Sequence, residues 1–244
     1  MDMLPLLPTA LSAVALGFFP IIIWLAFWLI EDRRHPEPRQ RLLVAFMAGM
    51  LSVPFVLGAQ AGAYAFVTYG TLLLFIWATI EAIAKIFFAW FFVLRDSAVD
   101  EPIDIPVYLI TVSLGFAALE NTLFLVQPLM YEGFAISATT GGLRFIGPTL
   151  IHVLDAVIIG SALALAFFRS RGEKILYGLI GIILAAALHA TFNILIIATD
   201  AEQSLSIFLG VWVAIIFALL MLERIKLLHP PAWWEKVFIS SRDR

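Results

Sequence analysis

The chain has 244 residues, of which 62% are hydrophobic and 14% charged, and its formal net charge is −3. Soluble domains average about 45–50% apolar and about 25% charged residues, so this composition excludes an ordinary soluble domain. The chain has no cysteine, which excludes disulfides and thiolate metal sites. It also has no basic run with interleaved aromatic residues, so no nucleic-acid partner is expected.

Apolar runs recur along the chain, each close to the roughly 20 residues that a helix needs to cross a bilayer. We therefore predict an all-α protein, a polytopic transmembrane helix bundle with about seven spans. The expected spans are residues 9–30, 42–63, 71–94, 106–127, 147–168, 175–198 and 204–223. The first span is expected to be retained, because no positive residue precedes it and no clear cleavage site follows it.

The basic residues predict the orientation of the bundle. Of the 15 Lys and Arg residues, all but Lys85 and Arg144 fall on one side of the seven spans. By the positive-inside rule that side is cytoplasmic, so the N-terminus is external and the C-terminus cytoplasmic. We expect one transmembrane domain over 1–228 and a cytoplasmic interfacial tail over 229–244, whose tryptophans suit the headgroup level.

Polar side chains within the spans are the most informative feature. A charge in a membrane-spanning helix costs about 2.5–3.5 kcal/mol on insertion scales, so it persists where it pairs, binds or reacts. Counted from the external helix ends, the carboxylates and imidazoles lie roughly 8–15 Å deep at 1.5 Å per residue, which predicts one shared site. The candidate residues are Glu81, Lys85, Glu120, Asn121, His152, Asp155, His189 and Asn193.

Spacing along each helix suggests how some of these groups pair. Glu81 and Lys85 are four residues apart and share a helix face, so Lys85 is expected to hold Glu81 ionised. His152 and Asp155 are three residues apart, so Asp155 is expected to orient or charge the imidazole. Taken alone, each pair could serve helix packing only.

Four short motifs carry the polar residues. Residues 81–85 read Glu-Ala-Ile-Ala-Lys, 116–121 read Phe-Ala-Ala-Leu-Glu-Asn, and 189–193 read His-Ala-Thr-Phe-Asn, with an isolated His152 between the last two. In this order they resemble the motifs of the PrsW family of intramembrane proteases, which are relatives of the CAAX-processing and Abi membrane proteases. Residues 32–39 are also similar to the family's Asp and Glu-Pro loop.

The resemblance implies an intramembrane endopeptidase of a prokaryotic cytoplasmic membrane. Such an enzyme hydrolyses a peptide bond of a membrane-anchored protein by activated water, here near the external leaflet. The family includes members that cut anti-sigma factors, so an anti-sigma factor is one candidate substrate. The chain departs from the family at Ala82, where a second glutamate is usual. If that glutamate activates water, this chain is slow or inactive, whereas if Glu81 does so, little is lost.

Two mechanisms fit the residues. In a metal-dependent version, Glu120, His152 and His189 bind zinc beside a water, and Glu81 accepts the proton of that water. In a metal-free version, Glu81 and Glu120 activate the water directly, and His189 and Asn193 donate to the oxyanion. The metal-free version is preferred, because the histidines lack the spacing of a His-Glu-x-x-His zinc site. The expected supporting residues are Lys85, Asn121 and Asp155.

Two other function classes stay open. Intramembrane Glu and His residues are also typical of proton-coupled transporters, although this chain is short and shows no repeated half. A catalytically silent scaffold or regulator would follow if Ala82 abolishes activity. The external segment 128–146 contains Gly133, Gly141 and Gly142. We predict that it is a flexible loop that gates substrate access.

Overall fold

The computed structural model describes residues 6–30, 36–199 and 201–231, and within these ranges every regular element is helical. Seven helical segments of the described chain are long and apolar enough to cross a membrane, which confirms the predicted bundle. The predicted loop residues 32–35 and most of the tail, residues 232–244, lie outside the described residues. The elements are α1 (Leu6–Trp28), α2 (Arg39–Phe66), α3 (Thr71–Ala89), the π-helical turn η1 (Trp90–Leu94), α4 (Asp104–Tyr131), α5 (Phe134–Ile146), α6 (Pro148–Leu165), α7 (Arg171–Ala198) and α8 (Ala201–Lys226).

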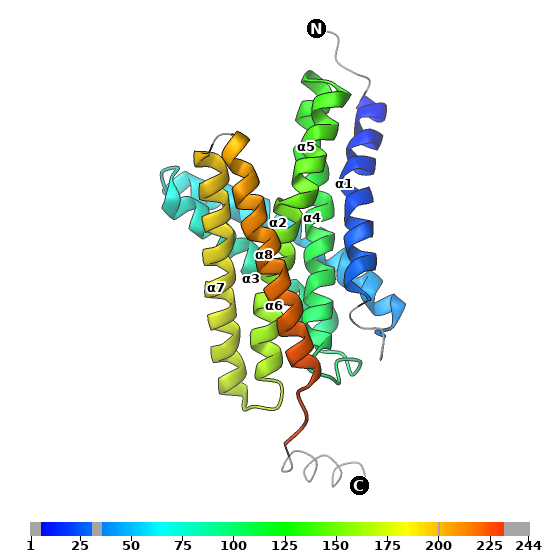
Figure 1. Cartoon of the computed structure of the whole chain (residues 1–244), viewed down its shortest axis with the longest axis vertical. Helices are drawn as coiled ribbons and strands as arrows, with labels where there is room; N and C mark the ends of the chain where they lie inside the picture. Colours follow the sequence, from blue (N-terminus) through cyan, green and yellow to red (C-terminus); the bar gives the residue numbers. More distant parts are fainter. Residues whose placement is uncertain (1–5, 31–35, 200, 232–244) are drawn as a thin grey trace.

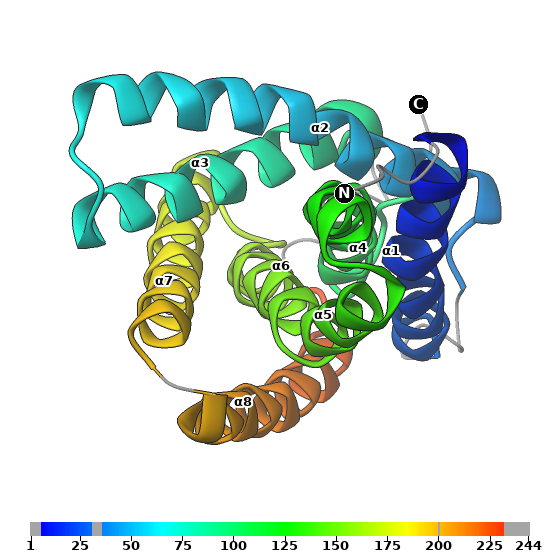
Figure 2. The ribbon, with the colours of Figure 1, turned by 90° about the horizontal axis from the view of Figure 1, so that it is seen from above.

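The helices α4 and α6 form the centre of the bundle. The most apolar window of α4 and that of the α5–α6 segment are each 72% buried, against at most 44% for the other spans. Figure 1 shows α1 on one flank of this centre and α7 on the other, with α8 running obliquely in front of α6. Figure 2 shows that α2 and α3 form a hairpin that crosses the remaining helices at a steep angle. The outer helices therefore present apolar surface to lipid, while the central ones carry buried polar groups.

Glycines set the closest helix crossing, between α2 and α4. A Cβ atom on Gly49 would overlap the carbonyl oxygen of Val112, and one on Gly115 would overlap the carbonyl oxygen of Phe46. The backbones of α2 and α4 are therefore in contact at two points, one at a glycine of each helix. Only glycine fits at positions 49 and 115. Small residues at such crossings are what allow helices to associate closely in lipid, where no hydrophobic effect drives them together.

Two further glycines bring the site-bearing helices together. A Cβ atom on Gly160 of α6 would lie 2.6 Å from the Cα atom of Pro106 on α4. One on Gly181 of α7 would lie 3.0 Å from the Cα atom of Ile159 on α6. Since α6 packs this closely against both α4 and α7, the polar side chains between the three helices can reach one another.

The segment 128–146 is not the flexible loop that the sequence predicts. α4 continues to Tyr131, a turn at Gly133 with φ of 91° follows, and α5 then occupies Phe134–Ile146. Such a left-handed turn favours glycine, which lacks the Cβ clash of other residues. Gly147 ends α5 and Pro148 opens α6, as proline commonly does in a first helical turn. The gate hypothesis for a loop here therefore loses its basis.

Polar contacts fix the end of the bundle where α2 begins. The buried carboxylate of Glu37 accepts a hydrogen bond from the hydroxyl of Tyr108 on α4, and its burial raises the pKa of Glu37. Within the first turn of α2, Arg41 pairs with Asp96, which follows η1. These contacts tie the first residues of α2 to α4 and to the end of α3.

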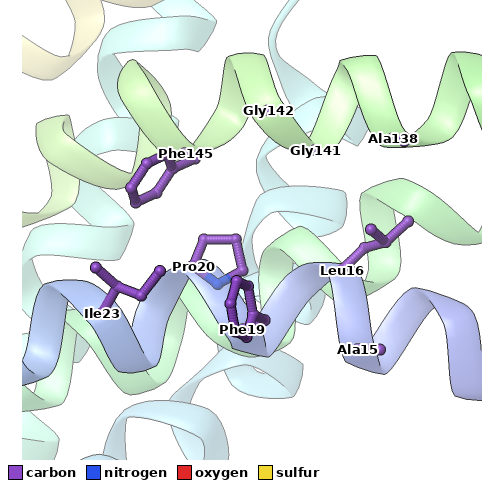
Figure 3. A pocket seen from close by; sticks show the side chains of 9 residues that line it. All are labelled: Ala15, Leu16, Phe19, Pro20, Ile23, Ala138, Gly141, Gly142 and Phe145. Carbon is purple, nitrogen blue, oxygen red and sulfur yellow. The ribbon is translucent and has the colours of Figure 1, made fainter.

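A crevice of about 380 Å³ lies between α1 and α5. Its lining residues are all apolar, among them Phe19, Pro20 and Phe145, which Figure 3 shows between the two helices. Since no polar group lines it, we interpret this crevice as lipid-facing surface rather than as a reactive site.

The substitution Gly49→Ala should destabilise the protein, because its methyl group would meet the backbone of α4, which cannot turn away. Overpacking of this kind costs about 1–3 kcal/mol. Gly58 lies on the same helix, and a methyl group added there would have nothing within 4 Å, so Gly58→Ala is the matched control. Thermal unfolding in detergent should show a lowered Tm for the first variant only. Equal Tm values for the two variants would contradict the proposed backbone contact.

Candidate active site

Four helices place polar side chains in one layer inside the bundle. The contributing residues are Glu81 and Lys85 from α3, Glu120 from α4, His152 and Asp155 from α6, and His189 from α7. All are buried except Glu120, whose side chain is 17% exposed. The sequence also pointed to Asn193, which lies one turn beyond His189 and is half-buried.

Asp155 joins two cationic or proton-donating groups at the centre of this layer. Its Oδ2 atom lies 3.1 Å from Nζ of Lys85 and 2.8 Å from Nδ1 of His189. Lys85 also lies 3.2 Å from Nδ1 of His152. The side chains of Lys85 and Asp155 are only 2% and 1% exposed. This is therefore a fully desolvated ion pair, which must be well hydrogen-bonded to be tolerated.

These partners differ from those that helix spacing predicts. Lys85 pairs with Asp155 on α6 rather than with Glu81 on its own helix. Asp155 contacts His189 on α7 rather than orienting His152 on its own helix. Residues three or four apart share a face, but on a face packed against other helices the partner on the neighbouring helix can be the closer one.

The network fixes the protons on the two imidazoles. An ammonium group has no acceptor, so Lys85 donates to Nδ1 of His152, and the proton of His152 then sits on Nε2. That Nε2 atom lies 3.1 Å from Oε2 of Glu120 and donates to it. His189 donates from Nδ1 to Asp155, which leaves the lone pair of its Nε2 atom available.

Glu81 faces both imidazoles. Its Oε1 atom accepts a hydrogen bond of 2.9 Å from Nε2 of Gln60 on α2, a residue that the sequence reasoning missed. Its Oε2 atom is buried without a hydrogen-bond partner. That atom lies 3.8 Å from Nδ1 of His152 and 3.8 Å from Nδ1 of His189. A buried carboxylate oxygen without a partner needs an explanation.

A metal ion would supply that explanation. Glu81, His152 and His189 each offer one ligand atom, and the three atoms lie within 4.8 Å of one another. Two ligands of a tetrahedral zinc, each about 2.0–2.2 Å from it, stand about 3.3–3.6 Å apart, so a small closure of the group suffices. The metal set expected from the sequence had Glu120 in place of Glu81. In the structure Glu120 instead pairs with Arg144 and His152.

Arg144 is the second residue that the sequence reasoning left outside the site. From the last turn of α5 its guanidinium pairs with Glu120, and its Nε atom donates to Oδ1 of Asn121 at 2.6 Å. It lies 4.0 Å from the ring centroid of Phe124. Asn121 in turn donates to Oγ1 of Thr149 at 3.0 Å. The signal was present in the sequence, because Arg144 was the one basic loop residue on the side opposite to all the others.

Aromatic rings enclose His152. The ring of Phe116 meets it edge-on at a centroid distance of 5.2 Å, and the ring of His189 does so at 5.1 Å. Lys85 also lies over Phe116, with its Nζ atom 5.2 Å from the ring centroid. The apolar surroundings lower the local dielectric and so strengthen each polar contact of the layer.

Residues 37–221 match the family model described as PrsW family intramembrane metalloprotease. This chain belongs to the PrsW family. It is 30% identical over 200 residues to Protease PrsW of Geobacillus kaustophilus, a match that covers 78% of this chain and 81% of the relative. It is 26% identical over 195 residues to Protease PrsW of Bacillus subtilis, covering 77% and 84%. No solved structure matches the chain. Family membership and the seven spans together show an integral bacterial membrane protein.

The substitution Lys85→Met should strongly destabilise the bundle, because it leaves the Asp155 carboxylate buried without its cation. Breaking a buried ion pair in this way costs about 3–5 kcal/mol. The double variant Lys85→Met with Asp155→Asn removes both charges and should recover part of the loss. Unfolding of the purified protein in mixed micelles would measure the coupling.

Lys226→Met is the control for this pair, because Lys226 contacts Glu223 at the exposed end of α8. Exposed pairs are worth about 0–1 kcal/mol, so its effect should be small. Additive effects of Lys85→Met and Asp155→Asn would contradict the coupling of these two side chains.

Proposed function

We propose that this protein is an intramembrane metallo-endopeptidase that cuts a membrane-anchored protein substrate at the layer of Glu81, His152 and His189. The observation that supports this most directly is the Oε2 atom of Glu81, which is buried without a hydrogen bond and lies 3.8 Å from each of two imidazoles inside an apolar bundle. The family description as metalloproteases favours this mechanism over the metal-free version that the sequence reasoning preferred.

Glu81, His152 and His189 would hold a divalent metal, with zinc suited to this N/N/O ligand set. His189 has the lone pair of Nε2 free for it, whereas His152 would bind through Nδ1 once Lys85 releases that atom and keeps its contact with Asp155. When bound, the metal polarises the scissile carbonyl and lowers the pKa of a water. Gln60 holds Oε1 of Glu81 and so turns Oε2 toward the histidines. Asp155 holds the Nδ1 proton of His189 and thereby orients its ring, as a carboxylate behind a ligating histidine commonly does.

Glu120 is the carboxylate left for proton transfer. Its side chain is 17% exposed, against 7% for Glu81 and 1% for Asp155, so water reaches it most easily. Arg144 and the Nε2 proton of His152 hold its Oε2 atom in place. We assign to Glu120 the acceptance of the proton of the attacking water and its delivery to the leaving amine. Asn193 is the candidate donor to the oxyanion.

The alanine at position 82 leaves intact the carboxylate on which this proposal depends, that of Glu81. The side chain of Ala82 is fully buried in the main hydrophobic cluster, one position from Glu81. A glutamate at position 82 would therefore add a second buried charge to α3, directly beside Glu81. We infer that Glu81 alone supplies the carboxylate of α3. If the basic end of the bundle is cytoplasmic, the reaction takes place in the external half of the membrane.

Glu81→Gln and His189→Ala should each abolish cleavage of a single-span substrate that carries the cut site within its external half. We expect a loss of at least about a hundredfold, the lower range for a residue that acts directly on proton transfer or the reacting groups. Thr191→Ala is the control on the same helix as His189, because Thr191 is exposed and its hydroxyl donates to the carbonyl oxygen of Ala187 within α7. Cleavage by both site variants at the parent rate would refute the protease proposal.

Metal analysis separates the two roles given to the carboxylates. His152→Ala and Glu81→Gln should lower the bound zinc of the purified protein, whereas Glu120→Gln should retain zinc and lose cleavage. Elemental analysis of each variant, with cleavage measured before and after chelation, tests this. Full cleavage by a protein that carries no metal and is insensitive to chelators would favour direct activation of water by Glu81 and Glu120.

A further inference from the structure

A second hollow lies away from the candidate active site, between α3 with η1 on one side and α7 on the other. It has a volume of about 1200 Å³. Its walls are mainly apolar and include Phe87 and Leu179, which are 55% and 53% exposed. In a bilayer such exposed apolar walls face the acyl chains of lipids rather than water.

The length of this groove matches one leaflet of the membrane. Its lining runs from Ile83 to Leu94 along α3 and η1, and from Arg171 to Ile182 along α7. At 1.5 Å per residue each wall is about 16 Å long. The hydrocarbon core of a bilayer is about 30 Å thick, so the groove suits acyl chains of one leaflet and is too short for a spanning helix.

Positive charge gathers at one end of the groove. Arg171 and Lys174 of α7 line it there, with Asp100 as the carboxylate of the lining. Lys174 lies 5.6 Å from the ring centroid of Phe167. Trp90, which lines the opposite wall, has Arg95 4.8 Å from its ring centroid, although Arg95 itself is outside the lining. Cations beside aromatic rings on both walls are typical of the membrane interface, where headgroups lie.

The π-helical turn η1 forms part of the same wall. Trp90 and Leu94, its first and last residues, both line the groove. π-helical turns are rare and are frequently found at functional sites. η1 ends one wall of the groove at Leu94, and Arg171 begins the other wall, which runs antiparallel to it. The end of α3 therefore departs from regular helix geometry at the end of the groove where a headgroup would be held.

We propose that this groove binds an anionic phospholipid, with its phosphate at Arg171 and Lys174 and its acyl chains along α3 and α7. Basic pockets between transmembrane helices on the cytoplasmic side are suited to anionic headgroups. The predicted orientation places this end of the bundle at the cytoplasmic leaflet. The binding site is separate from the proposed peptidase chemistry and does not depend on it.

Native mass spectrometry of the detergent-purified protein with phosphatidylglycerol tests this proposal. The double variant Arg171→Gln with Lys174→Gln should bind this lipid roughly thirtyfold more weakly, since each basic residue near the surface contributes about 1 kcal/mol. Phosphatidylcholine should bind the parent protein weakly and should not distinguish it from the variant. Glycerol 3-phosphate, which lacks acyl chains, should not compete.

Two further variants keep the proposal falsifiable. Arg224→Gln with Lys226→Gln removes two charges from α8 at the same end of the bundle, outside the groove lining, and should leave phosphatidylglycerol binding unchanged. Leu179→Trp fills the groove at an exposed position and should weaken binding without removing charge. Unchanged lipid binding in the Arg171 and Lys174 variant, equal losses in the α8 control, or competition by glycerol 3-phosphate would each overturn the proposal.

Discussion

The contact of Asp155 with Lys85 and His189 is the interaction on which the polar layer depends. Hydrocarbon offers no solvation for a charge, so a carboxylate at this depth must be met by donors from other helices. Asp155 is met by one donor from α3 and another from α7. These two hydrogen bonds to one carboxylate link α3, α6 and α7 more specifically than apolar packing does, since apolar surface packs as readily against lipid as against protein.

The same constraint explains why Glu81 stands out. The other carboxylates of the layer have cationic partners, Lys85 for Asp155 and Arg144 for Glu120. Glu81 has an amide hydrogen bond on one oxygen and two imidazoles near the other. Two carboxylate oxygens among the described residues of the layer are buried without a hydrogen bond, Oε2 of Glu81 and Oδ1 of Asp155. Of the two carboxylates, only Glu81 lacks a Lys or Arg partner, and its Oε2 atom lies beside two histidines, the side chains that most commonly bind zinc.

Hydropathy and the positions of polar residues were sufficient to predict the seven spans and the polar side chains that meet between them. Individual partners were not predictable, because they depend on helix rotation, which the glycine crossings set. Gly49 and Gly115 show this, since their contact involves backbone atoms that no side-chain pattern reports. The composition of α5, rich in glycine and threonine, resembles a loop, and its helix forms because it packs against α4 and α6. Arg144 was therefore assigned to a loop and its contact with Glu120 was missed.

The chain order of the polar residues has a consequence for biosynthesis. His189 lies on α7, so a nascent chain that has inserted only its first six helices already contains Glu81, Glu120 and His152 but not the second imidazole. The proposed metal-binding group therefore cannot assemble before α7 has entered the bundle, so the first six helices can insert and pack without binding metal through the full set of three ligands.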